Sequence, residues 1–238
     1  MTGRQHRRVT TRNFNKLHRA LDLTVHRHHF QLLFAVGAAE LGGSSEQLAK
    51  HIDSEYAKWK KVVEAAKRMQ PGDPLDPASF MGAMVDETQT KRVMGYIEAG
   101  QKEGAKLAFG GKQVHVDNAG SFIQPTLFDE VNNQMKIARE EIFGPVLSVI
   151  PVKDPEQALT VANDTIYGLA SAIFTADINK AFKFAKGLRT GSVWVNTYDG
   201  GDITTPFGGY KQSGNGRDKS LHAFDKFTQI KTTWIQLG

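Results

Sequence analysis

Apolar residues in the first half of the chain recur at the spacing of a helix. Between residues 44 and 69 they return every three or four positions, which predicts one amphipathic helix ending near Met69, with Leu48, Ile52, Tyr56, Trp59, Val63 and Ala66 on one face. Pro71, Pro74 and Pro77 follow, and a proline cannot donate a backbone hydrogen bond to a helix or a sheet. A second helix is expected from Asp86 to Gln101, with Val93, Met94 and Ile97 on its buried side.

From about residue 105 the pattern changes to short strands alternating with helices. Gly110-Gly111 predicts a turn between two strands, Lys106–Phe109 and Gln113–Val116. The apolar run Val146–Val152 has the length of a buried strand. Asp154 is suited to the N-cap, and Pro155 to the first position, of a helix that runs to Ala162.

Two further strands, Ala170–Thr175 and Gly191–Asn196, flank a helix that Asp177 would cap. One face of that helix is expected to carry Ile178, Ala181, Ala185 and Leu188. Strands and helices in this alternation predict an α/β fold with parallel strands joined by right-handed crossovers. Ligands of such sheets bind beyond the carboxyl ends of the strands, which draws attention to Asn196 and the loop that leads to Phe207.

The end of the chain predicts one more strand. Phe227–Gln236 is rich in β-branched residues and contains Trp234. No helix follows to cover it, so this strand needs a partner, for which a second subunit is one candidate.

Composition narrows the class of protein. The chain has 238 residues, 40% of them hydrophobic and 23% charged, as in a soluble globular protein with a sizeable core. No stretch has the length of an apolar membrane span or the pattern of a signal peptide. The sequence contains no cysteine, which excludes disulfides, thiolate metal sites and thiol catalysis within this chain. With no other indication, the cytoplasm is the expected location.

Charge is concentrated near the N-terminus. Asp22 is the only carboxylate before Glu40, in a stretch that contains Arg4, Arg7, Arg8, Arg12, Lys16, Arg19 and Arg27. Such an arm can bind nucleic acid or an anionic membrane, and an acid-poor, Arg-rich start is also typical of a mitochondrial transit peptide. Without a recognisable nucleic-acid motif, a poorly ordered segment over residues 1–43 is favoured. His26, His28 and His29 have no acidic or cysteine neighbours, so no metal site is predicted.

Four segments carry a family resemblance: REEIFGPV (Arg139–Val146), NDTIYGLA (Asn163–Ala170), GSVWVN (Gly191–Asn196) and PFGGYKQSGNGR (Pro206–Arg217). In this order they resemble the C-terminal part of the NAD(P)-dependent aldehyde dehydrogenase family, and the branch that oxidises aminoaldehydes of the gamma-glutamyl-gamma-aminobutyraldehyde type is the most similar. The resemblance implies a parallel doubly wound sheet within a catalytic domain over residues 44–222, then an oligomerisation strand over residues 223–238.

The same resemblance implies roles for single residues. Glu141 would accept hydrogen bonds from the nicotinamide ribose of NAD or NADP, and Phe143 would flank the nicotinamide ring. Phe207 would line the aldehyde tunnel, with Asp199, Asp202 and Thr204 at its mouth. Asn163, Tyr167 and Gly168 are interpreted as structural, as a helix cap, and Asp218 as a salt-bridging residue.

From residue chemistry alone, structural roles are favoured for Glu141 and Phe143: Glu141 would cap a turn and Phe143 would belong to the core. The family match favours the cofactor-binding roles instead. Glu140 and Glu141 would point to opposite faces of an extended segment, so they cannot act as an acid–base pair. Ser220, His222 and Asp218 lie too close in sequence for a catalytic triad. Glu40 sits in a Glu-Leu-Gly-Gly run like that of the family's general base, but Ser44 replaces the usual lysine, and we interpret it as a chance match.

No catalytic residue is predicted, because the family attacks its aldehyde with a cysteine thiolate. Two hypotheses follow. The chain is a truncated family oxidoreductase that keeps part of the active-site wall, or a catalytically silent fragment that acts as an oligomerisation module. The abrupt start of the resemblance suggests a frameshift or a misplaced start. Expected partners are a small-molecule aldehyde and a second copy bound through Phe227–Gln236; neither a membrane nor a nucleic acid is expected.

Overall fold

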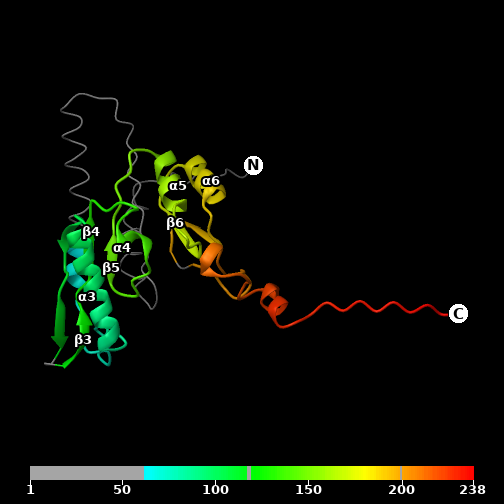
Figure 1. Ribbon diagram of the computed structural model, residues 1–238, viewed down its shortest axis with the longest axis horizontal. Helices are drawn as coiled ribbons and strands as arrows, with labels where there is room; N and C mark the ends of the chain where they lie inside the picture. Colours follow the sequence, from blue (N-terminus) through cyan, green and yellow to red (C-terminus); the bar gives the residue numbers. More distant parts are fainter. Residues whose placement is uncertain (1–61, 117–118, 199) are drawn as a thin grey trace, which may run out of the picture. The chain divides into compact units, whose positions relative to one another are not determined.

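A computed structural model describes residues 62–116, 119–198 and 200–238 (Figure 1). The chain divides into two compact units, unit 1 from Met1 to Asp164 and unit 2 from Thr165 to Gly238. The helix predicted over residues 44–69 begins outside the described residues, and its described part is helical from residue 62 to residue 68. The domain limits at residues 43 and 222 stay predictions.

Helix α3 (Glu87–Lys102) organises unit 1. Asp86 is its N-cap, and the Asp86 carboxylate accepts a hydrogen bond from the Gln89 N–H at 2.7 Å, which satisfies a donor of the first turn. Val93 and Ile97 are buried as predicted, and Met94 packs against the edge of the core. The whole buried face consists of Thr90, Val93, Tyr96, Ile97 and Gly100.

The sheet of unit 1 has the order β1-β4-β5. β1 (Lys106–Phe109) is antiparallel to β4 (Thr126–Asp129), and β4 is parallel to β5 (Val146–Ser148). A separate antiparallel ribbon pairs β2 (Gln113–Val116) with β3 (Ala119–Ile123). The predicted bounds of β1 and β2 are confirmed, but β5 is shorter than the predicted Val146–Val152.

β1 and β2 do not pair with each other, although two glycines turn the chain between them. A Cβ atom on Gly110 would lie 2.0 Å from the Pro125 carbonyl oxygen, so only glycine lets the chain cross β4 here. The Gly111 N–H donates to the Thr126 hydroxyl at 2.9 Å and ties the crossing to β4. β1 therefore pairs with β4, and β2 pairs with β3.

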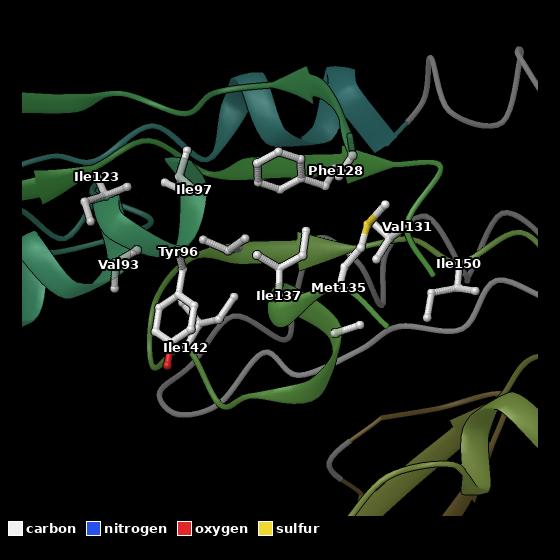
Figure 2. Packing of buried hydrophobic residues seen from close by; sticks show 13 residues of the cluster. Val93, Tyr96, Ile97, Ile123, Phe128, Val131, Met135, Ile137, Ile142 and Ile150 are labelled. Carbon is white, nitrogen blue, oxygen red and sulfur yellow. The ribbon is translucent and has the colours of Figure 1, made fainter. Parts of the chain in front are cut away.

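The core of unit 1 lies between α3, the sheet and the short helix α4 (Lys136–Arg139), as Figure 2 shows. Phe128 of β4 and Ile137 of α4 are fully buried there. A Cβ atom on Gly100 would lie 2.9 Å from the Ile137 Cδ1 atom, so this glycine lets α3 approach α4 closely. Helix α5 (Pro155–Asn163) follows β5 and begins as predicted, with Asp154 as N-cap and Pro155 in the first turn.

Unit 2 contains the predicted strand–helix–strand element. β6 (Ala170–Ile173) and β7 (Ser192–Val195) are parallel, with Ala170 opposite Ser192, and α6 (Ile178–Gly187) connects them. Asp177 caps α6 as predicted. The predicted buried face was wrong in part: Ala181, Phe184 and Leu188 are buried, whereas Ile178 and Ala185 are exposed, because the helix turns its large Phe184 inward instead.

The predicted strand Phe227–Gln236 is absent from the single chain. After the short 3₁₀ helix η2 (Leu221–Lys226), residues 228–238 form no helix or strand, since no described segment pairs with them (Figure 1). Their apolar side chains are exposed, Ile230 at 102% and Trp234 at 90%. In the described part of the chain, no helix has both the length and the apolar character needed to cross a bilayer.

Replacing Phe128 with alanine should remove the centre of the unit 1 core. Because Phe128 is fully buried, Phe128→Ala should lower the free energy of unfolding by about 3–5 kcal/mol. Leu75→Ala is the control, since Leu75 is 89% exposed, and should change it by less than about 0.5 kcal/mol. Urea unfolding of the two variants would contradict this core if their midpoints fell equally.

Candidate functional site

The residues singled out from the sequence fall into both units. Glu141 and Phe143 lie close together in unit 1, on the segment between α4 and β5. Phe207 lies in unit 2, on the loop after β7.

Glu140 is held against α3. It is the C-cap of α4 and its backbone is extended, with φ −112° and ψ 150°. Its Oε2 atom accepts a hydrogen bond from the Tyr96 hydroxyl at 2.8 Å, and the Lys136 ammonium is 4.0 Å away. These two contacts fix the Glu140 side chain beside α3.

Phe143 has an uncommon backbone. Its φ is +53°, in the left-handed region, which costs a residue with a Cβ atom about 1–2 kcal/mol. The Gln89 side-chain amide donates to two successive carbonyls, that of Ile142 at 3.0 Å and that of Phe143 at 3.1 Å. The Phe143 ring is 49% exposed, whereas Ile142 beside it is buried. The segment therefore anchors Ile142 in the core and presents Phe143 outward, so the interpretation of Phe143 as a core residue is wrong.

Gly144 completes this arrangement. A Cβ atom there would lie 2.6 Å from the Val93 Cγ2 atom, so a larger residue would push the segment away from α3. One helix thus fixes the segment through Gln89, Val93 and Tyr96.

Phe207 is fixed by a short antiparallel bridge to Asp218. The Phe207 N–H donates to the Asp218 carbonyl at 2.8 Å, and the Asp218 N–H donates to the Phe207 carbonyl at 2.6 Å. The Lys219 ammonium lies 5.8 Å from the centre of the Phe207 ring. The Asp218 carboxylate forms an ion pair with Lys226, which confirms its predicted salt-bridging role.

The glycines of unit 2 allow backbone segments to meet. The Gly168 N–H donates to the Ser213 hydroxyl at 3.0 Å, and the Gly168 carbonyl accepts from Gly191 at 3.0 Å and from Tyr210 at 2.8 Å. A Cβ atom on Gly191 would lie 1.6 Å from the Gly208 carbonyl oxygen. Gly168 is therefore structural as predicted, but as a junction of three segments and not as a helix cap; the C-cap of α5 is Asp164.

Asn196 directly follows the carboxyl end of β7, and no specific role was predicted for it. Its φ is +55°, and its side chain pairs with the backbone of Thr175: Oδ1 accepts from the Thr175 N–H at 2.7 Å, and Nδ2 donates to the Thr175 carbonyl at 2.9 Å. The side chain continues the pairing of β6 and β7 while the backbone turns away toward Phe207. The sequence signal for this role is an asparagine at the end of a predicted strand, because asparagine tolerates a positive φ.

The loop after Asn196 has its own restraints. The Trp194 indole N–H donates to the Gly200 carbonyl at 2.5 Å, and the Tyr198 ring lies 5.2 Å from the Trp194 ring. Hydrogen bonds from the Thr204 hydroxyl and backbone lower the pKa of Asp202, so its exposed carboxylate stays ionised. Asp199 lies outside the described residues, as do Glu40 and His26, His28 and His29.

Ser220, His222 and Asp218 do not form a triad. The His222 ring contacts Asp225 at 3.1 Å, and the Asp218 carboxylate contacts Lys226. In the described part of the chain, no three His, Asp or Glu side chains gather as a metal site would require.

Comparison with known proteins gives a consistent result. Residues 48–233 match the model of the Aldehyde dehydrogenase family. The NADP/NAD-dependent aldehyde dehydrogenase PuuC of Escherichia coli is 44% identical over 208 residues, which are 87% of this chain and 40% of PuuC. The chain thus spans less than half the length of the curated relatives it matches.

Solved structures are similar as well. The AldA indole-3-acetaldehyde dehydrogenase of P. syringae, in complex with NAD+ and IAA, is 58% identical with a TM-score of 0.73, over 75% of this chain and 36% of AldA. The gamma-glutamyl-gamma-aminobutyraldehyde dehydrogenase of Burkholderia cenocepacia is 53% identical with a TM-score of 0.72, over 76% of this chain and 36% of its own.

Removing the Asn196 amide should loosen the end of the β6–β7 pair. Asn196→Ala loses two hydrogen bonds and keeps an unfavourable φ, so unit 2 should lose about 1–3 kcal/mol. Faster hydrogen exchange at the Thr175 amide, followed by NMR, would report this. Asn215→Ala, at an exposed position in the same unit, is the matched control. Equal exchange at Thr175 in both variants would rule out the proposed pairing.

Proposed function

The chain belongs to the aldehyde dehydrogenase family, and from this we propose that it forms part of the wall of an NAD(P)-dependent aldehyde dehydrogenase active site. The observation that carries the proposal is the segment fixed by α3, which directs the Phe143 ring outward from a left-handed backbone. Strained backbone held by its surroundings is typical of ligand-binding sites. The proposed cofactor-binding residues are Glu141 and Phe143, and the proposed substrate-binding residue is Phe207.

The chemistry of these side chains fits NAD or NADP. A carboxylate such as Glu141 can accept hydrogen bonds from both hydroxyls of a ribose. An exposed ring such as Phe143 can limit the orientation of a nicotinamide beside it. When bound, the nicotinamide accepts the hydride that leaves the substrate. PuuC is named for both cofactors, and AldA has NAD+ bound, which supports either choice here.

In unit 2, Phe207 is the residue proposed to contact the aldehyde. Its backbone is paired with Asp218, and Gly208 follows at a point where a Cβ atom would lie 2.4 Å from the Gly216 carbonyl oxygen. A ring on so constrained a loop offers a fixed apolar surface to a substrate chain. Asp202 and Thr204, on the same loop, stay the proposed residues of the tunnel mouth.

The nucleophile has to come from outside this chain. Aldehyde oxidation in the family proceeds through a thioester, which needs a thiolate, and the 238 residues contain no cysteine. Relatives have more than twice the matched length, so another segment has room to supply it. The chain by itself is therefore proposed to hold but not to convert an aldehyde.

An aminoaldehyde is the proposed substrate class. Support comes from the Burkholderia cenocepacia enzyme, whose name specifies an aminobutyraldehyde. AldA, named for indole-3-acetaldehyde, is similar at 58% identity, so an aromatic aldehyde is the competing class. A cytoplasmic location is also proposed. Mitochondria are the competing location, because several similar mammalian proteins are named as mitochondrial.

A second candidate function is that of an oligomerisation module. The observation that favours it is the exposed apolar C-terminal segment, in which Ile230 and Trp234 contact little of their own chain. Strand-forming residues without a partner readily pair with another chain. A second copy bound through Phe227–Gln236 would supply that partner.

Purified chain should produce no NADH from NAD+ and an aminoaldehyde, because thiol attack cannot occur. The same assay with indole-3-acetaldehyde should also show no NADH absorbance above the blank. Full-length PuuC serves as the positive control. Sustained NADH production by the chain alone, with either aldehyde, would refute the proposed dependence on an external thiolate.

The mass of the chain in solution tests the oligomerisation proposal. Wild-type chain should form dimers or larger assemblies, and the double variant Ile230→Asp, Trp234→Asp should shift toward monomer because it places charge on the pairing strand. Lys231→Ala removes a charge from the same segment and should leave the mass unchanged. Light scattering coupled to size exclusion measures all three. Identical masses would exclude the segment as the interface.

A further inference from the structure

We propose that Gln89 is a positioning residue for the nicotinamide wall. Its side-chain amide holds the Phe143 peptide in the left-handed conformation and thereby sets the direction of the Phe143 ring and of the neighbouring Glu141. The proposal rests on the function proposed above for Glu141 and Phe143, and it adds a residue 54 positions away from Phe143 in sequence.

The geometry of the two hydrogen bonds carries the inference. In extended backbone, successive carbonyls point in opposite directions, so a single donor cannot reach both. The Gln89 Nε2 atom reaches the carbonyls of both Ile142 and Phe143, at 3.0 Å and 3.1 Å. This is compatible with a chain that turns at Phe143, where φ is +53°. The amide therefore binds the turned form and has no equivalent pair of acceptors in the extended form.

Gln89 is itself well placed to act as a fixed support. It lies in the first turn of α3, where its N–H is held by the Asp86 carboxylate at 2.7 Å. Its backbone is consequently part of a capped helix end, and its side chain is half-buried. A support that is already ordered loses little conformational entropy when it binds the Phe143 peptide.

Two further residues on the same face of α3 hold the segment on either side. Val93 and Tyr96 follow Gln89 at helical positions i+4 and i+7, which lie on one face. Val93 packs against Gly144, and the Tyr96 hydroxyl donates to Glu140. Gln89 binds the peptide of Phe143 itself. Its loss should therefore change the conformation at Phe143 while Val93 and Tyr96 keep the rest of the segment on α3.

The role requires a donor. Gln89→Glu keeps the length of the side chain but replaces the NH₂ group with an oxygen that faces two carbonyls. The capping bond is retained, because it uses the backbone N–H of residue 89. Gln101→Glu is the matched control on the same helix, since the Gln101 amide donates to the Ile97 carbonyl within α3, at 3.4 Å.

The experiment uses the full chain labelled with ¹³C and ¹⁵N at its 14 phenylalanines. NMR follows the carbonyl and amide shifts and the HN–Hα coupling of Phe143, whose signals are identified by their loss in Phe143→Leu. A titration with nicotinamide mononucleotide then measures binding. Gln89→Glu should move the Phe143 signals away from left-handed values and weaken binding at least about tenfold. Gln101→Glu should change neither.

The two readouts separate this inference from the proposed function. If Gln89→Glu moves the Phe143 signals but wild-type chain does not bind the mononucleotide, the Gln89 support stands and the cofactor assignment fails. If the Phe143 signals stay at their wild-type positions, the support is disproved whatever the binding result. Gln89→Ala deletes the donors without adding a charge. If Gln89→Glu lowers the melting temperature, Gln89→Ala takes its place, with the same expected changes in the Phe143 signals and in binding.

Discussion

The packing of α3 against the segment from Glu140 to Gly144 is the constraint on which the proposed site depends. Val93 is fully buried on the core face of α3, and Gly144 approaches it so closely that no side chain fits between them. The hydrogen bonds of Gln89 and Tyr96 then decide how the segment lies on the helix. A half-exposed phenylalanine on left-handed backbone is compatible with folding only because these contacts outweigh its local cost.

In the proposed site, the residues that would hold a ligand are distinct from the group that would convert it. The contacts described above for Phe143 come from residues 86–146, and those described for Phe207 come from residues 165–226. None of these contacts requires a cysteine. The active-site wall proposed for this chain of the aldehyde dehydrogenase family is therefore compatible with a sequence that contains no cysteine.

Local signals made much of the fold predictable. Asp154 and Asp177 each cap the helix expected of them, because a carboxylate that accepts from the first turn acts over a few residues. Strand partners could not be predicted in the same way. The crossing at Gly110 sends β1 to β4, a pairing set by contacts distant in sequence. Phe143 and Asn196 show the same limit: their residue types were noted, but their backbone conformations depend on Gln89 and on Thr175, which lie 54 and 21 positions away.

A crystal structure of the chain grown with NAD+ tests the central claim most directly. We expect the nicotinamide ring to lie beside Phe143 and its ribose hydroxyls to contact the Glu141 carboxylate, while φ at Phe143 stays positive with the Gln89 amide on both carbonyls. A dinucleotide bound elsewhere on the chain, or a Phe143 with an ordinary negative φ and no contact to Gln89, would contradict it.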